Sequence, residues 1–575
     1  MKPLYRRYAR ALRKAYSLRN RRDFLRNCID EMVTPRSTPK QLLQFDHPFP
    51  SPVQTYLTEC SNLLSIQSSQ AFEEARKLGS QLRSIMSNTR AEILRADIAS
   101  FNFQQKERLA RQLSSLCANS RWKSMGRPDI ITNISSRPLS DVETEVLSLG
   151  LKFATGIPKP SQNIDLITKN YRYKDSDFQQ GYIQGLLTSA LCDTPNPTLP
   201  KRYLRALEAL AKDPAIRITT ADKGGGVVVM DAISYQQKMT DLLSDGNTYA
   251  EVTQAKVDIE TQNFLKAARR ILRRSETGKC LLHLLPNLPR PATLYGLPKT
   301  HKPNIPMRPI TSGIGSAPHK LAGALAKHLS RLLGTISGAH LKHSGDLLNR
   351  IRDIPARNKK LASLDVTSLF TRVPTLKVIH LLRAKISSAN LDLPLPHNDF
   401  VDLVELCVQF NFFKFQDHFF HQRFGMAMGS PLSAVLANLF MEFLEAGPFA
   451  DIVPVNVVWL RYVDDILLIA PRRLDIPRLQ AALNEVEPSI QFTLEEEINE
   501  SIPFLDTLIM KHGNLLKFKV YRKPTNKDDL THFLSHHDLR IKKGVVLGFY
   551  LRAFRIYCPE FLEEEFVHIK EVFQK

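Results

Sequence analysis

The chain has 575 residues, more than one hydrophobic core accommodates, so we expect roughly three or four subdomains. Its hydrophobic content of 43% and charged content of 24% are typical of a soluble globular protein, and the absence of a long apolar run excludes a membrane span. The formal net charge of +22 indicates a polyanionic partner, most simply nucleic acid, although a chance basic surface or a ribosome-associated protein would also be basic.

The N-terminal part reads as helical and basic. Residues 1–30 predict a basic helix, and the first 26 residues hold ten Lys and Arg residues against Asp23 alone. Such a segment serves as a nucleic-acid arm, as a nuclear-import signal or simply as a solvated helix face. Prolines between 35 and 52 predict a linker, and helical periodicity follows from about 54 to 118.

The middle of the chain changes character. Helices are predicted at about 140–150, 201–212 and 318–334, and the run VVVM within 216–230 predicts a buried strand after a glycine turn. A proline-rich loop occupies 296–309. The seven cysteines are scattered without a CxxC pair, which argues against a zinc ribbon and a disulfide framework and fits a reducing compartment.

Two later strand signals carry acidic residues. Asp365 lies in LASLDVTSLF (361–370), and the YVDD sequence of Tyr462–Asp465 lies between apolar runs within 457–470, as in a tight hairpin turn. Two metal ions can neutralise the attacking and leaving oxygens of phosphoryl transfer, and Asp carboxylates are suitable bridging ligands for Mg²⁺. A surface turn with two Asp residues is the simpler alternative for YVDD alone.

A glycine-rich loop lies between these acidic segments. In FGMAMGSPLSAVLANLF (424–440), Gly425 and Gly429 allow a backbone to approach a ligand closely, and Pro431 predicts the start of a helix over 431–446. The informative feature is the order along the chain: an Asp strand, a Gly-Ser-Pro helix and an Asp-Asp hairpin.

That order resembles polymerase motifs A, B and C of reverse transcriptases. More narrowly, the chain resembles the reverse transcriptases of Penelope-like elements, which are retrotransposon polymerases related to telomerase. The segments that carry the resemblance are LGLKFATG (149–156), ADKGGGVVVMD (221–231), YGLPKTHKPNIPMRPITSGIGSAPHKLA (295–322), SLDVTSLFTRVP (363–374), AMGSPLSAVLANLFMEFLE (427–445), RYVDDILLI (461–469), PFLDTLI (503–509) and YRKPTNKDDLTHFLSHH (521–537).

The resemblance implies an α+β right-hand polymerase with fingers, palm and thumb. It implies a mostly helical, basic RNA-binding region over 1–148, an N-terminal extension and fingers over 149–360, a palm over 361–510 and a thumb over 511–575. Penelope-like elements commonly carry a GIY-YIG endonuclease, but no such pattern occurs in this sequence, so we expect no DNA cleavage.

The implied activity is that of an RNA-directed DNA polymerase, a nucleotidyltransferase that extends a DNA primer 3′ end on an RNA template. Asp365, Asp464 and Asp465 would be catalytic and would hold two Mg²⁺ ions, with Asp465 coordinating less directly and the carbonyl of Val366 as a further ligand. The alternatives are a telomerase-like polymerase and a non-catalytic nucleic-acid-binding protein that keeps the polymerase fold.

Five residues are expected to contact the incoming dNTP. Lys299 and Arg308 would clamp the triphosphate, although contact with the template backbone is an alternative. The ring of Phe370 would exclude a ribose 2′-OH, unless it is ordinary core packing. Met428 and Gly429 would pack on the nucleotide and template bases.

Further nucleic-acid contacts are expected at Lys223, which would touch template or nucleotide, and at Tyr521, Arg522 and Lys523. Phe504 resembles the primer-grip region, with packing between palm and thumb as the alternative. The implied partners are an RNA template, expected to be the element's own transcript, a DNA primer or target-site 3′ end, and dNTP, without a membrane. The protein would act in the nucleus after synthesis in the cytoplasm.

Overall fold

The structure is a computed structural model that describes residues 2–39, 49, 51–83, 85–118, 126–155, 199–388 and 392–574. Its contacts divide the chain into two compact units, which are Met1–Ile216 with Asp529–Lys543 and Arg217–Asp528 with Gly544–Lys575. The predicted α+β class with a helical N-terminal region is confirmed. The division falls inside the predicted region 149–360, and the fingers, palm and thumb boundaries stay a prediction. None of the described helices has the length and apolar character that a membrane crossing requires.

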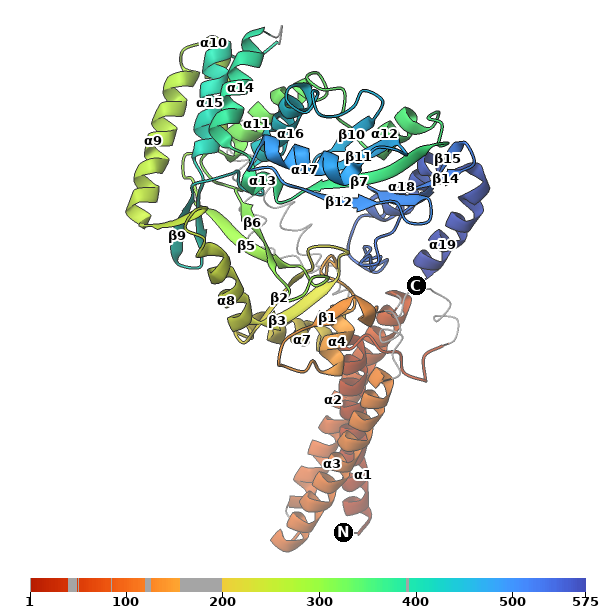
Figure 1. The fold of residues 1–575 in the computed structure, drawn as a ribbon. Helices are drawn as coiled ribbons and strands as arrows, with labels where there is room; N and C mark the ends of the chain where they lie inside the picture. Colours follow the sequence, from red (N-terminus) through yellow and green to blue (C-terminus); the bar gives the residue numbers. More distant parts are fainter. Residues whose placement is uncertain are drawn as a thin grey trace. The chain divides into compact units, whose positions relative to one another are not determined.

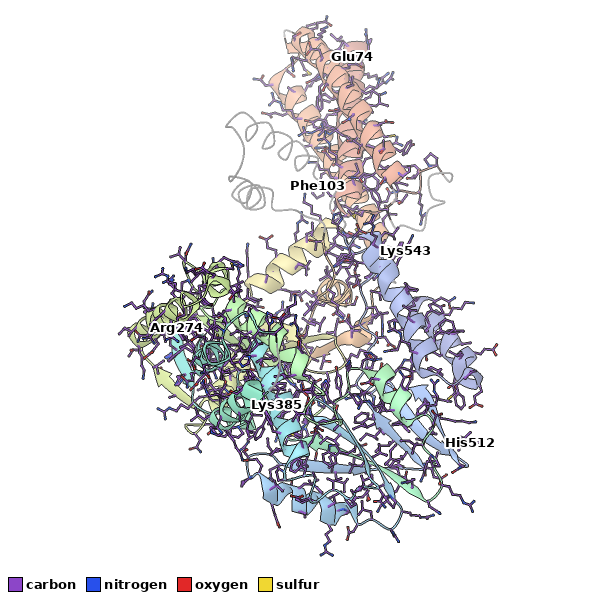
Figure 2. The ribbon with its side chains drawn as sticks, turned by 90° about the horizontal axis from the view of Figure 1, so that it is seen from above. Glu74, Phe103, Arg274, Lys385, His512 and Lys543 are labelled. Atoms are coloured by element: carbon purple, nitrogen blue, oxygen red, sulfur yellow. The ribbon has the colours of Figure 1, made fainter. Side chains whose placement is uncertain are left out.

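The first unit consists mainly of long helices (Figure 1). The helix α1 packs against α2 and α3, and these two helices occupy most of the stretch from about 54 to 118 that was predicted to be helical. Glu74 of α2 and Phe103 of α3 are labelled in Figure 2. Most of the predicted proline linker and residues 156–198 lie outside the described residues. The regular elements of this unit are α1 (Lys2–Asp30), α2 (Ser51–Arg83), α3 (Asn88–Ala118), β1 (Ile131–Asn133), α4 (Asp141–Leu147) and α7 (Lys201–Lys212).

The basic helix α1 is an integral part of its unit. Ala11, Ala15 and Phe24 of α1 are buried, and α1 packs against both α2 and α3. A free N-terminal arm is therefore not what the structure shows, although many of the Arg and Lys side chains of α1 remain exposed.

The second unit is built around an antiparallel four-stranded sheet with the order β10-β11-β7-β12 (Figure 1). Its strands are β7 (Lys359–Val366), β10 (Val458–Tyr462), β11 (Asp465–Pro471) and β12 (Phe492–Glu496). The predicted strand over 361–370 ends at Val366, and the short helix α13 (Leu369–Arg372) follows it. The three other sheets of the described chain involve β2 (Ile216–Thr220), β3 (Val227–Asp231), β4 (Tyr249–Val252), β5 (Ala292–Pro298), β6 (Met307–Ser312), β8 (Phe412–Phe415), β9 (His418–Gln422), β13 (Ser501–Phe504), β14 (Thr507–His512) and β15 (Leu515–Val520), besides β1.

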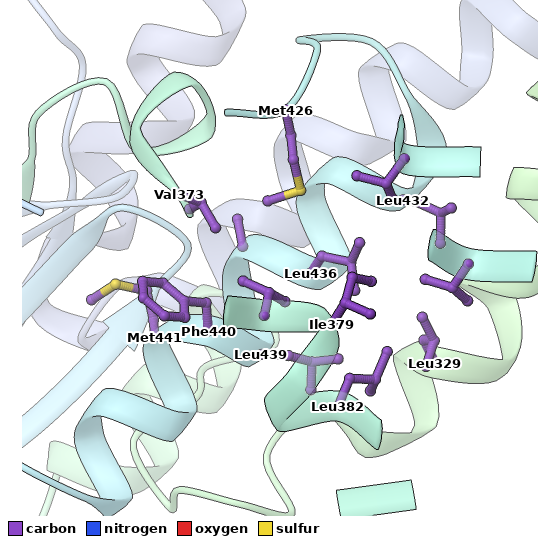
Figure 3. Packing of buried hydrophobic residues seen from close by; sticks show 14 of the residues in the cluster. Leu329, Val373, Ile379, Leu382, Met426, Leu432, Leu436, Leu439, Phe440 and Met441 are labelled. Atoms are coloured by element: carbon purple, nitrogen blue, oxygen red, sulfur yellow. The ribbon is translucent and has the colours of Figure 1, made fainter. Parts of the chain in front are cut away.

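Both faces of the central sheet are buried. Alternate residues such as Leu364 and Leu468 pack on helices, whereas Leu361 and Leu467 pack on the β13-β14-β15 sheet and α12, as the two-residue period of a strand requires. On the helical side, Leu432 and Leu436 of α16 lie with Ile379 of α14 (Figure 3). Besides α13, the α-helices described after residue 217 are α8 (Ala232–Leu243), α9 (Gln254–Leu272), α10 (Glu276–Lys279), α11 (His319–Leu329), α12 (Ser344–Ile351), α14 (Thr375–Ser388), α15 (His397–Gln409), α16 (Pro431–Ala446), α17 (Ile476–Val486), α18 (Leu539–Ile556) and α19 (Leu562–Gln574). Double-sided packing fixes the register of the central strands, and that register positions the acidic residues.

Candidate active site

The three predicted catalytic residues meet at one end of the central sheet. Asp365 at the end of β7 is the register partner of Asp465 at the start of β11. Asp464 precedes Asp465 in the hairpin turn, and its carbonyl accepts a hydrogen bond of 2.9 Å from the N–H of Val366. Strands that are about a hundred residues apart in the sequence therefore bring these carboxylates to the same edge.

The hairpin between β10 and β11 turns through Val463 and Asp464, with Tyr462 and Asp465 as the closing pair. Val463 has φ of 58°, a left-handed conformation that costs energy for a β-branched side chain. Such strain persists only where surrounding contacts hold the backbone in place.

Arg461 supplies such a contact. It is completely buried, its Nη1 donates to the carbonyl of Val463 at 3.1 Å, and its Nε lies 2.5 Å from Oε1 of Glu445 on α16. A further hydrogen bond of 2.7 Å runs from Nη1 to Oδ1 of Asn438. Arg461 thereby ties the turn to α16, a role that sequence analysis missed, although an Arg inside the apolar run VVWLRYV was a signal for a buried ion pair.

The carboxylates destabilise one another's charge. Burial, together with the neighbouring charge of Asp464, raises the pKa of Asp365 above its usual value, although the side chain still reaches solvent in the cleft. Burial and then the charges of Asp464 and Asp365 raise the pKa of Asp465 to about 6. Lys523 and Lys223 oppose both shifts. Partly buried carboxylates that repel one another favour a bound cation.

The carboxylates at this edge supply only some of the oxygen ligands that a hard divalent ion requires. In the part of the chain that the structure describes, no three His, Cys, Asp or Glu side chains are grouped so as to enclose a metal ion. Mg²⁺ usually keeps water ligands and takes others from substrate phosphates, so two or three carboxylates at one edge are compatible with it. Coordination by Asp365, Asp464, Asp465 and the carbonyl of Val366 stays a prediction.

A cleft of about 940 Å³ opens beside these carboxylates. Asp365 and Asp464 line it together with Phe370, Met428, Lys299 and Arg308, so the structure brings most of the predicted nucleotide-binding residues to one cavity. Phe370 also packs against the large helical core, which means that both interpretations of this ring describe part of its surroundings. A second cleft of about 620 Å³ adjoins Asp365 and Asp465.

The glycine-rich loop before α16 packs closely on neighbouring backbone. The N–H of Thr311 on β6 donates to the carbonyl of Met428 at 2.7 Å, and Gly429 has φ of 120°. A Cβ at Gly429 would lie 2.2 Å from the carbonyl oxygen of Thr311, which no side chain tolerates. The predicted close approach at Gly429 is thus to β6, and it places Met428 in the cleft wall.

Cations line the larger cleft together with the carboxylates. Lys299 and Arg308 belong to the β5-β6 hairpin region, and burial followed by the charge of Arg308 lowers the pKa of Lys299. Lys223 lines both clefts. Two cations that repel one another beside a polar cleft favour a bound anion, and contact with a triphosphate stays a prediction.

The loop that carries Lys223 is locked to the segment after β15. Gly224 has φ of 80°, and a Cβ there would lie 1.7 Å from the carbonyl oxygen of Thr525. The N–H of Lys527 donates to the carbonyl of Gly224 at 3.2 Å. Two sequence blocks about 300 residues apart therefore form one wall, which holds Lys223 and Lys523 beside the second cleft.

The other residues predicted to contact nucleic acid lie in different surroundings. Phe504 is 3% exposed and belongs to the hydrophobic core between the central sheet and the β13-β14-β15 sheet. It also lines the second cleft with Tyr521. Arg522 is instead engaged by the buried carboxylate of Glu565, which leaves its guanidinium committed to a structural ion pair. A contact of Arg522 with nucleic acid would require that pair to open.

Comparisons with known proteins identify part of this unit. Residues 302–494 match the family described as reverse transcriptase (RNA-dependent DNA polymerase), and residues 529–575 match the animal helix-turn-helix domain. The chain therefore contains a reverse transcriptase domain, which holds Arg308 and the three Asp residues predicted to be catalytic but not Lys223. No curated protein matches the chain.

Solved structures of yeast telomerases are similar to the chain at low identity. Telomerase from Candida albicans with a fragment of telomeric RNA is 12% identical, with a TM-score of 0.40 over 77% of this chain and 73% of that one. Telomerase from Candida tropicalis with the corresponding fragment is 10% identical, with a TM-score of 0.42 over 95% of this chain and 84% of that one. Apo telomerase from Candida tropicalis is 11% identical, with a TM-score of 0.42 over 78% of this chain and 80% of that one.

Proposed function

We propose that the reverse transcriptase domain is catalytically active and that the chain is the RNA-directed DNA polymerase of a Penelope-like retroelement. The observation that supports this most directly is the pairing of Asp365 with Asp465 across β7 and β11, beside a cleft that Lys299 and Arg308 also line. Carboxylates and cations that line the same cleft suit a substrate whose phosphates must be bound and whose reacting oxygens need metal ions. The proposed partners are the element's own RNA, a DNA 3′ end in the nucleus and dNTP.

The carboxylates and the cations of the cleft would have separate roles in the reaction. Asp365 and Asp464 would hold two Mg²⁺ ions with support from Asp465, and the ions would supply charge neutralisation at the reacting phosphate. Lys299 and Arg308, which line the same cleft, would orient the triphosphate. Lys523 and Lys223 favour the ionised form of Asp465, because their charges lower its pKa against the larger raising effect of burial. Groups that are already in place when substrate binds need little reorganisation during the reaction.

Primer extension tests the proposal. The full chain is incubated with a DNA primer annealed to RNA, the four dNTPs and Mg²⁺, and product length is measured with and without EDTA. Extension of primers on unrelated RNA templates supports the proposal, whereas extension that requires one dedicated RNA indicates the telomerase-like alternative. Binding of RNA without extension identifies a non-catalytic protein.

Sugar selection provides a second prediction. Changing Phe370 to Ala should raise the ratio of rNTP to dNTP incorporation by about tenfold or more, since it removes a clash with the 2′-OH rather than an attraction to dNTP. The ratio of kcat/KM for CTP and dCTP in single-nucleotide insertion measures the effect.

Phe424→Ala is the matched control, since it removes a second ring from the lining of the same cleft. An unchanged ratio in Phe370→Ala, or an equal change in both variants, would show that Phe370 belongs only to the helical core.

The exposed face of α1 provides a third prediction, on RNA affinity. Arg6, Arg10 and Lys14 are exposed and follow one another at four-residue spacing, whereas the neighbouring Arg13 pairs with Asp97 at 2.6 Å. Changing Arg6, Arg10 and Lys14 to Ala should make the slope of log K against log salt less negative by roughly two units, since each phosphate contact contributes about 0.7 to 0.9. Filter binding of RNA between low and moderate salt measures this slope.

Substitution is preferable to deletion here, because deleting residues 1–26 would also remove buried residues of α1. The control is the change of the exposed residues Arg95, Arg108 and Arg111 of α3 to Ala. It removes the same number of positive charges, but these three residues do not follow one another at four-residue spacing. Equal slopes for both triple variants would mean that α1 has no special part in binding RNA.

A further inference from the structure

The carboxylate of Asp222 is buried beside the cations that line the larger cleft. Its side chain is 3% exposed, and its Oδ1 lies 2.5 Å from Nε of Arg308. Its backbone N–H donates to the carbonyl of Pro298, at the end of β5, at 3.0 Å. The residue is thus attached through its backbone to β5 and through its carboxylate to β6, which pairs with β5.

The ion pair is close without being a regular hydrogen bond. Nε of Arg308 and Oδ2 of Asp222 are both buried, and neither has a hydrogen-bond partner among the described residues. Buried polar groups are normally satisfied, and exceptions in native proteins often mark sites that bind or react. An arginine whose terminal nitrogens acquire a ligand could rotate to satisfy its Nε as well.

The charges around Asp222 explain what its carboxylate does there. Lys299 and Arg308 repel one another, and the charge of Asp222 counteracts that repulsion, as it does for His301 beside Lys223. Without this carboxylate, Arg308 would be expected to move away from Lys299 towards solvent, because its side chain is 36% exposed.

We propose that Asp222 is a positioning residue that holds Nε of Arg308 and so directs the terminal nitrogens of the guanidinium towards the triphosphate of an incoming nucleotide. A planar guanidinium can be held through Nε while its two terminal nitrogens bind phosphate oxygens, which a Lys ammonium cannot do. This inference rests on the proposed function and adds a residue that lies outside the segment matched to the reverse transcriptase family.

The proposal and simple electrostatics predict opposite changes in the KM for dNTP when Asp222 is replaced by Asn. Asp222→Asn removes a negative charge near the triphosphate, so charge alone would lower the KM for dNTP. Loss of positioning should instead raise that KM by roughly tenfold, with a smaller change in kcat, because a uniform binding contact is weakened. In an Arg308→Ala background the same substitution should change the KM by less than about twofold.

The experiment is a double-mutant cycle of Asp222→Asn and Arg308→Ala in primer extension, with KM and kcat measured for one dNTP. Asp241→Asn is the control, because Asp241 is an exposed carboxylate on α8 whose Oδ1 accepts from Gln237. A raised KM that vanishes in the Arg308→Ala background supports the proposal. A lowered KM, or equal effects of Asp222→Asn in both backgrounds, overturns it.

The positioning role of Asp222 can be tested even if the chain has no polymerase activity. If the wild-type chain does not extend a primer, the cycle is read from equilibrium binding of a fluorescent dNTP analogue in the presence of Mg²⁺. A Kd raised by Asp222→Asn only when Arg308 is present still supports the positioning role. A Kd that Asp222→Asn leaves unchanged or lowers overturns it, and thermal unfolding of each variant shows that the unit remains folded.

Discussion

Replacing Asp464 by Asn is expected to lower the rate of primer extension by about a thousandfold or more, because one charge that would bridge the metal ions is lost from the transition state. Asn has nearly the same shape, and the hydrogen bond from Val366 reaches the backbone carbonyl of residue 464, so the hairpin should persist. RNA affinity should stay close to that of the wild type, since the basic surface is unchanged. Single-turnover extension and filter binding measure the two quantities separately.

The control is Asp451→Asn, an equal change of charge at an exposed position that follows α16. It should leave the extension rate within about twofold of the wild type, as substitutions at exposed positions usually do. Extension by Asp464→Asn at the control's rate would refute the metal-binding assignment of the YVDD turn. Loss of RNA binding together with activity would indicate instead that the substitution unfolds the unit.

The second large effect is expected on stability. Changing Arg461 to Ala leaves the carboxylate of Glu445, 3% exposed in its side chain, without its partner. Breaking a buried ion pair on one side typically costs about 3–5 kcal/mol, so the midpoint of urea unfolding should fall markedly. Of the two tryptophans, Trp459 donates from Nε1 to Glu445 at 3.2 Å, so its fluorescence in a Trp122→Phe background reports on this site.

A second variant separates stability from positioning. Arg461→Met with Glu445→Gln removes both charges while keeping an acceptor for Trp459, so much of the stability should return. Polymerisation should remain low, because the carbonyl of Val463 has lost its donor and the strained turn is no longer held. Full activity in this double variant would show that Arg461 only neutralises Glu445, and an unchanged midpoint in Arg461→Ala would show that the pair contributes no stability.

Local chemistry of the sequence determined much of the fold near the site. Apolar β-branched runs on either side of YVDD predicted the hairpin of β10 and β11, and Pro431 predicted the first residue of α16. These predictions were possible because a turn, a helix start and a buried strand each depend on residues that are close together in the chain. The strand that carries Asp365 was predicted too long, since a left-handed residue at Ser368 ends it and begins α13.

The partners of individual side chains depended on the tertiary structure. The pairs Asp365 with Asp465, Asp222 with Arg308, and Gly224 with Thr525 join segments separated by about 90 to 300 residues. No local pattern specifies such pairs, because they follow from strand register and from which faces of the sheet are buried. The basic helix α1 shows the same limit: its charge was evident from the sequence, but only the packing of Ala11, Ala15 and Phe24 decided that it is part of a folded unit. The sequence by itself thus determined which chemical groups the protein has, whereas long-range packing decided which of them line the same cleft.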